Sequence, residues 1–127
     1  MVESNSLKVL ICDDSILIRK KLKECLIDCG CGEILEASDG QNAVDKFKLH
    51  RPDLVFMDIV MPVKDGIEAV TEIIAFDNNA KIVMASSSGT KAFLIKALEA
   101  GAFDFIQKPF EEAHVRKIIL GANKGVK

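Results

Sequence analysis

The chain has 127 residues, of which 49% are hydrophobic and 28% are charged, and its formal net charge is -2, which fits one globular domain rather than a disordered chain. The slightly acidic balance, with a pI near 5.7, provides no positive field for nucleic acid or anionic lipid. No apolar run approaches the ~20 residues that a membrane span requires, and residues 1–6 carry no signal-peptide pattern, so we expect a cytoplasmic protein.

The first part of the chain alternates between short apolar strands and helices. Residues 7–12 (LKVLIC) are rich in branched apolar side chains, which predicts the first strand. Residues 15–29 then repeat apolar side chains at helical spacing, and Gly30 is expected to end this helix. Residues 33–37 (EILEA) predict a second, weaker strand, followed by a turn at Asp39-Gly40. One face of the second helix then consists of Ala43, Val44 and Phe47.

The most informative segment is residues 53–66 (DLVFMDIVMPVKDG). Its apolar run 54–57 has the length of a strand buried on both faces, and it stops at Asp58, with Pro62 shortly after. Asp58 is therefore expected at the carboxyl end of a central strand, where open parallel sheets bind ligands. An aspartate in this place also often caps the following loop, so Asp58 alone does not decide between a structural and a functional role.

The alternation continues to the end of the chain. A third helix, with Ile67, Val70 and Ile74 on one face, precedes a predicted fourth strand at residues 81–85 (KIVMA). The fourth helix is expected over residues 90–100, with Gly101 as its C-cap. Residues 102–107 (AFDFIQ) predict the fifth strand. Acidic side chains then favour the start of a last helix, whose apolar face consists of Val115, Ile118 and Ile119.

Five strand-helix pairs in strict alternation define the predicted architecture. This pattern is typical of a parallel sheet with helices on both faces, joined by right-handed crossovers. Five strands are too few for an eight-stranded barrel. The sequence therefore predicts an α/β, doubly wound, three-layer sandwich, formed by one domain over residues 1–127.

Four cysteines raise the question of a disulfide or metal site. Cys12 lies in the first apolar strand and is expected to be a small buried hydrophobic residue. Cys25, Cys29 and Cys31 form a C-x3-C-x-C pattern. A structural zinc site usually takes two separated pairs of ligands, and the nearest histidine, His50, is remote in sequence. We therefore expect reduced thiols.

Polar side chains mark the carboxyl ends of four predicted strands, namely Asp13 with Asp14, Asp58, Ser86 and Lys108. Because parallel strands point the same way, these ends meet at one edge of the sheet. Crowded carboxylates raise one another's pKa unless a cation lies among them, and Mg²⁺ accepts such ligands together with water and phosphate. A solvated acidic rim with a weak surface ion pair is the alternative, but the convergence of four strand ends favours a binding site.

The whole chain resembles the receiver domains of two-component response regulators, in particular the single-domain CheY type of chemotaxis. The resemblance rests on the acidic pair in VLICDDS, the aspartate in LVFMDIVMPVKDG, the hydroxyl in IVMASSSG and the lysine in DFIQKPF. It implies a flavodoxin-like sheet with strand order 2-1-3-4-5, the order for which CheY itself is a reference example. It also implies a signalling switch that catalyses only its own phosphorylation and dephosphorylation.

The resemblance assigns Asp58 as the residue that a histidine kinase phosphorylates. Asp14, Asp58 and the backbone carbonyl of Val60 would bind Mg²⁺, for which Mn²⁺ or Ca²⁺ would substitute, and Asp13 would hold the ion mainly through water. Val60 and Ser88 match the two variable positions beside the phosphoryl group, where the family tunes hydrolysis, so the sequence does not predict the lifetime of the phosphorylated state.

The resemblance also assigns the residues that respond to phosphorylation. Ser86 and Lys108 would contact the phosphoryl group, and the loop after the fourth strand would shift. Phe105 matches the aromatic switch position, but it lacks the hydroxyl that would hydrogen-bond in an inward position. A cis peptide bond between Lys108 and Pro109 is a further expectation, since cis is least costly before proline.

The face formed by the fourth helix, fifth strand and fifth helix is the expected output surface. The fourth helix carries more apolar residues than one core-facing stripe can bury, namely Phe93, Leu94, Ile95, Ala97 and Leu98. Leu120 and Phe105 would add to an apolar cluster, and such clusters often mark partner sites. The expected partner is a flagellar switch component or a second copy of this chain, with no nucleic acid or membrane bound by this chain alone.

Two other functions fit these residues less well. Phosphatases with an aspartate nucleophile carry a second acid two residues after it, where this chain has Val60. A flavin-binding module would need a phosphate-cradling loop after the first strand, and the chain has no Trp or Tyr to stack on the ring. Two alternatives stay open: a receiver from a longer regulator with an output domain, such as a DNA-binding one, and a phosphorelay intermediate.

Overall fold

The computed structural model describes residues 7–87 and 90–124 and shows strands and helices in alternation. The elements are β1 (Lys8–Cys12), α1 (Ile16–Asp28), β2 (Glu33–Ala37), α2 (Gly40–His50), β3 (Leu54–Asp58), α3 (Gly66–Phe76), β4 (Ile82–Ser86), the 3-10 helix η1 (Lys91–Phe93), α4 (Leu94–Glu99), β5 (Asp104–Gln107) and α5 (Glu112–Lys124). The strands form one parallel sheet in the order β2-β1-β3-β4-β5. The predicted fold and strand order are therefore confirmed.

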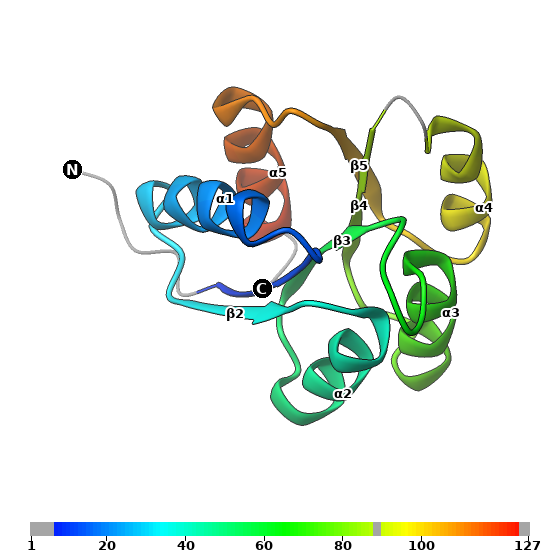
Figure 1. The fold of residues 1–127 in the computed structure, drawn as a ribbon. Helices are drawn as coiled ribbons and strands as arrows, with labels where there is room; N and C mark the ends of the chain where they lie inside the picture. Colours follow the sequence, from blue (N-terminus) through cyan, green and yellow to red (C-terminus); the bar gives the residue numbers. More distant parts are fainter. Residues whose placement is uncertain (1–6, 88–89, 125–127) are drawn as a thin grey trace.

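Two layers of helices enclose the sheet (Figure 1), with α1 and α5 on one face and α2, α3 and α4 on the other. All five residues of β3 are buried, as expected for a central strand. Because successive side chains of a strand point to opposite faces, Phe56 packs with Leu26 of α1, whereas Met57 packs with Phe47 of α2. The sheet thus divides the interior into two cores and fixes the strand ends between them.

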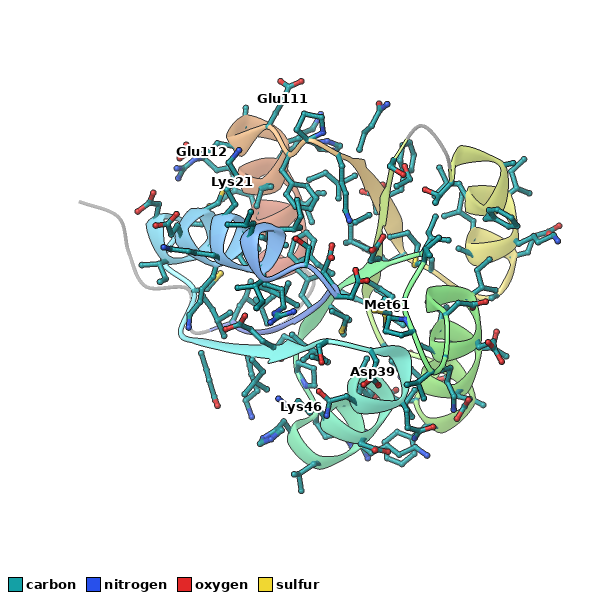
Figure 2. The ribbon with its side chains drawn as sticks, in the orientation of Figure 1. Lys21, Asp39, Lys46, Met61, Glu111 and Glu112 are labelled. Atoms are coloured by element: carbon teal, nitrogen blue, oxygen red, sulfur yellow. The ribbon has the colours of Figure 1, made fainter. Side chains whose placement is uncertain are left out.

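Polar side chains begin the first three helices. The Ser15 hydroxyl accepts a hydrogen bond from the Ile18 N–H and starts α1, and Asp39 does the same for α2 (Figure 2). Asp65 and Glu68 form a reciprocal capping box at α3. Such caps satisfy the free N–H groups of a first turn. Because α1 starts so soon after β1, only a short turn carries the acidic pair at the sheet edge.

The fourth helix differs from its prediction over residues 90–100. It begins with η1, and α4 itself has only six residues. Thr90 lies in a turn, where its hydroxyl accepts a hydrogen bond from the Ser87 N–H at 2.9 Å. No side chain caps α4 at Phe93, where η1 ends. Gly101 follows α4 with a φ of 116°, as expected for a C-cap glycine.

Three smaller findings complete the fold. β5 begins at Asp104 rather than at residue 102, so it is shorter than predicted. The peptide bond between Lys108 and Pro109 is cis, which confirms that prediction. In the described ranges, no helix is both long and apolar enough to cross a membrane.

Candidate functional site

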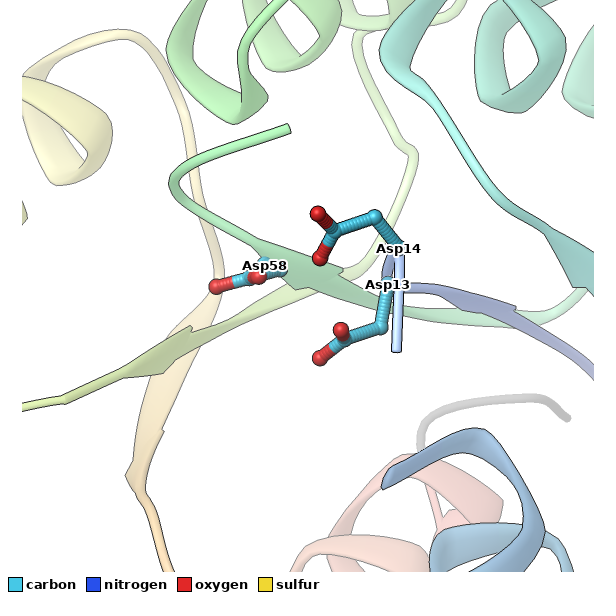
Figure 3. A group of neighbouring side chains, drawn as sticks. All are labelled: Asp13, Asp14 and Asp58. Atoms are coloured by element: carbon cyan, nitrogen blue, oxygen red, sulfur yellow. The ribbon is translucent and has the colours of Figure 1, made fainter. Parts of the chain in front are cut away.

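Three carboxylates meet at the carboxyl edge of the sheet. Asp13 and Asp14 follow β1, and Asp58 ends β3, the strand beside it. Each contributes one carboxylate oxygen to a group in which these oxygens lie within 4.8 Å of one another (Figure 3). The predicted convergence of the acidic strand ends is therefore present in the structure.

Lys108 provides the positive charge of this cluster. Its Nζ donates a hydrogen bond to Asp13 Oδ2 at 2.6 Å and lies 3.3 Å from Asp58 Oδ1. The side chains of Asp13 and Asp58 are only 5% and 11% exposed, so water screens these ion pairs less than it screens surface pairs. Lys108 and Asp13 are 95 residues apart in sequence, and only the fold brings them together.

The charges of the cluster are not balanced. Burial and the charge of Asp13 raise the pKa of Asp58, and the nearby Lys108 offsets only part of this effect. Burial would lower the pKa of Lys108, but its hydrogen bond to Asp13 and the charge of Asp58 outweigh burial and raise it. One ammonium among three carboxylates leaves net negative charge. A hard divalent cation such as Mg²⁺, which prefers oxygen ligands, fits this donor set.

The two aspartates of the acidic pair have different surroundings. Asp13 is buried, and both its carboxylate oxygens accept hydrogen bonds, one from the Ser15 N–H at 2.9 Å and one from Lys108. Asp14 is exposed, and within the described part of the chain its carboxylate has no hydrogen bond. Asp14 is therefore the more accessible of the two for a ligand.

The remaining predicted residues lie around this cluster. Ser86 is buried at the end of β4, and its carbonyl accepts a hydrogen bond from the Lys108 N–H at 2.8 Å. Val60 is exposed in the loop after β3, and Phe105 on β5 is 42% exposed rather than turned into the core. Ser88 lies outside the described residues.

Two residues that shape the site, Gly66 and Arg19, have roles that the sequence did not predict. A Cβ on Gly66 would lie 2.1 Å from the carbonyl oxygen of Asp58, so only glycine fits there. The Asp-Gly pair that ends the central motif was an available signal for this constraint. Arg19 donates from Nη1 to the Asp13 carbonyl oxygen at 2.7 Å, but a basic residue on an amphipathic helix gives no such signal.

A family model described as the response regulator receiver domain matches residues 9–120. Together with the parallel sheet and its edge of aspartates and lysine, this match shows that the chain belongs to the response regulator receiver family. The predicted family membership is confirmed.

Individual relatives make the comparison more specific. The chain is 45% identical over 112 residues to the chemotaxis protein CheY of Bacillus subtilis, covering 88% of this chain and 93% of that protein. The CheX-CheY-BeF3-Mg²⁺ complex from Borrelia burgdorferi matches with a TM-score of 0.85 and 37% identity, covering 95% of this chain and 90% of that chain. NtrX from Brucella abortus matches with a TM-score of 0.86 and 30% identity over 94% of this chain, which spans only 27% of the NtrX chain. The protein is thus a CheY-like receiver domain of a two-component response regulator.

Proposed function

We propose that this chain is a phosphorylatable switch whose Asp58 accepts a phosphoryl group from a histidine kinase in a Mg²⁺-dependent step. The observation that carries this proposal is the group of three carboxylates within 4.8 Å, with the Lys108 ammonium 3.3 Å from Asp58. The similarity to a CheY structure whose description includes BeF3 and Mg²⁺ supports it. The proposed unit covers residues 1–127, acts in the cytoplasm and binds neither nucleic acid nor membrane.

In the proposed step, an Asp58 carboxylate oxygen attacks the phosphorus of a phosphohistidine. The P–N bond breaks, its electron pair stays with the kinase imidazole, and Asp58 becomes an acyl phosphate. Asp13 holds the Lys108 ammonium beside Asp58, where it would neutralise charge on the transferred oxygens. We propose that the chain catalyses only its own phosphorylation and dephosphorylation.

The acidic residues would hold the metal ion. Asp14, Asp58 and the backbone carbonyl of Val60 are its proposed direct ligands, and Asp13 would act mainly through water, in accord with its occupied carboxylate oxygens. When bound, Mg²⁺ supplies positive charge next to the phosphoryl oxygens, and Mn²⁺ or Ca²⁺ are expected to substitute. Oxygen ligands of this kind suit all three ions.

The new phosphoryl group would then change the output surface. Ser86 would contact the phosphoryl group, the loop after β4 would shift, and Phe105 would move toward the vacated space. The α4-β5-α5 surface already exposes large apolar side chains, namely Phe93, Ile95, Leu98, Phe103, Phe105 and Leu120. Ala97 is buried in the core instead. Since clustered apolar residues often mark partner sites, we propose this surface as the one that phosphorylation controls.

The proposed context is chemotaxis, with a flagellar switch component as the partner, because the chain covers 93% of a CheY protein at 45% identity. A second copy of the chain is the alternative partner. The chain also resembles NtrX and spans 27% of that longer protein. This supports a second candidate function, as the receiver of a longer regulator. A role as a phosphorelay intermediate would use the same Asp58 chemistry.

Incubation with acetyl phosphate and Mg²⁺ tests the acceptor directly. The intact mass should rise by one phosphoryl group, and removal of Mg²⁺ with EDTA should prevent the rise. D58N should not be labelled, because its amide is not a nucleophile. Equal labelling of D58N would contradict the assignment of Asp58.

Amide hydrogen exchange tests the output surface. Addition of BeF3⁻ with Mg²⁺, a phosphoryl mimic, should change exchange in α4, β5 and α5. D58N with the same additions is the control and should show no change. Exchange changes confined to α1 would contradict the proposed surface.

A further inference from the structure

The turn between β1 and α1 is fixed by hydrogen bonds to every polar group of Asp13. Its backbone N–H donates to the Ala37 carbonyl at 3.1 Å. Its carboxylate accepts from Ser15 and Lys108. Its carbonyl oxygen accepts from Arg19 Nη1 at 2.7 Å. Arg19 is therefore the only side chain in the described part of the chain that hydrogen-bonds to the backbone of Asp13.

This backbone also determines where Asp14 lies. The Asp14 carboxylate is exposed and, among the described residues, has no hydrogen bond that would orient it. Its distance from Asp58 therefore depends on the conformation of the turn (Figure 3). Fixing the Asp13 carbonyl limits rotation of the peptide that joins Asp13 to Asp14.

Arg19 is itself held in place from the neighbouring strand. Its Nε donates to Glu36 Oε1 at 3.0 Å, and the Arg19 side chain is only 15% exposed. Lys23, one turn further along α1, approaches the other oxygen of Glu36 at 3.5 Å. A planar guanidinium can donate in two fixed directions at once, which an ammonium cannot do with the same geometry. Arg19 thus connects β2 rigidly to the turn that carries the acidic pair.

We propose that Arg19 is a positioning residue for the carboxylates of Asp13 and Asp14. This inference rests on the proposed Mg²⁺ site, and it adds a residue that touches neither the ion nor the phosphoryl group. Residues that orient metal ligands typically change metal affinity by about 10- to 100-fold when replaced. Glu36 on β2 holds Arg19 through the 3.0 Å hydrogen bond to Arg19 Nε, so β2 helps to position the acidic pair.

Mg²⁺ affinity, followed by amide chemical shifts during titration, tests the inference. R19Q should bind Mg²⁺ about tenfold more weakly than the wild type, and R19K should lie between them because lysine replaces one of the two hydrogen bonds. K23Q is the matched control: Lys23 shares Glu36 but does not touch Asp13, so its Mg²⁺ affinity should equal that of the wild type. A folded R19Q with wild-type affinity would overturn the inference.

Amide exchange in the absence of Mg²⁺ separates this inference from the proposed function. R19Q should speed exchange at the Asp13 and Ser15 amides, whereas K23Q should not. Faster exchange in R19Q, with no Mg²⁺ binding by any variant or by the wild type, would support the role of Arg19 and contradict the metal site. Unchanged exchange in R19Q would overturn the role of Arg19. If R19Q does not fold, R19K and E36A should show the same effects more weakly, and wild-type behaviour of both would overturn the inference.

Discussion

Replacement of Gly66 by alanine should displace Asp58, because the added Cβ would clash with the Asp58 backbone. The added Cβ would lie 2.1 Å from the Asp58 carbonyl oxygen and 2.9 Å from the Ile59 Cα, and both distances are under the 3.0 Å that real Cβ atoms keep. The atoms in the way are backbone, so no side-chain rotation relieves the clash. Either the start of α3 or the end of β3 must move.

The size of the effect follows from two costs. Overpacking of a tight site costs typically 1–3 kcal/mol, or about 2. The Gly66 N–H also donates to the Ile59 carbonyl at 2.7 Å, and loss of such a bond costs about 1 kcal/mol. G66A should therefore lower the free energy of unfolding by about 3 kcal/mol. With a urea slope of about 2 kcal/mol per molar, the midpoint should fall by about 1.5 M.

The assay is urea unfolding followed by circular dichroism, because the chain has no Trp or Tyr. G121A is the matched control: the same substitution in α5 meets nothing within 4 Å and should raise stability by about 0.5–1 kcal/mol. Folded G66A should also label more slowly with acetyl phosphate, because Asp58 is displaced. A wild-type midpoint and labelling rate for G66A would refute the reasoning.

Three further predictions concern charge, packing and a thiol. K108Q should fold but label with acetyl phosphate about a hundredfold more slowly, since it lacks the ammonium beside Asp58; an unchanged initial rate would count against Lys108. L26A should lower the free energy of unfolding in urea by about 2–5 kcal/mol, because Leu26 is 0% exposed. L17A, on the same helix but at a position 77% exposed, should change it by less than about 0.5 kcal/mol. Equal costs for both would contradict the assigned core face of α1. Burial raises the pKa of Cys25 from 9.0 to about 11, so at pH 8 its thiolate fraction should be about a hundredfold below that of the unfolded chain. Iodoacetamide should therefore label Cys25 slowly in the native protein at pH 8, and faster as the pH rises toward about 11. Rapid labelling of the native protein at pH 8 would contradict a raised pKa of Cys25.

The environment of Cys25 explains why its thiol is a useful probe. It lines a pocket of about 240 Å³ between α1 and α5, together with Lys21 and Glu112 (Figure 2). Cys12 and Cys25 have free thiols in the structure. Cys25 is partly exposed, so we expect its raised pKa to limit the reaction more than access does.

Most of the fold could be predicted because local pattern and global topology agree. Residues 54–57 are all buried, and their fully apolar composition predicted a strand buried on both faces. The cluster of Asp13, Asp58 and Lys108 also followed from sequence, because parallel strands bring their carboxyl ends to one edge. Once the strand ends are predicted, Asp13, Asp58 and Lys108 are therefore expected to lie close together.

Other features depend on contacts that leave no local pattern. The first turn of the fourth helix is a 3-10 turn rather than an α turn, and apolar spacing does not distinguish the two. No side chain caps α4 at Phe93. The contact of Arg19 with the Asp13 carbonyl depends on the packing of α1 against β2. Likewise, the Cβ clash at Gly66 depends on how closely α3 approaches β3.

The hydrogen bond between Lys108 and Asp13 also orders events during synthesis of the chain. Its partners are 95 residues apart, and a chain made from its N-terminus exposes both Asp13 and Asp58 long before Lys108 leaves the ribosome. Contacts this distant in sequence form late, since the intervening chain must first be ordered. A partly made chain therefore contains Asp58, the proposed acceptor, without the Lys108 ammonium beside it. If Asp58 is the proposed acceptor, we therefore expect efficient phosphoryl transfer only after β5 has docked and placed Lys108 beside Asp58.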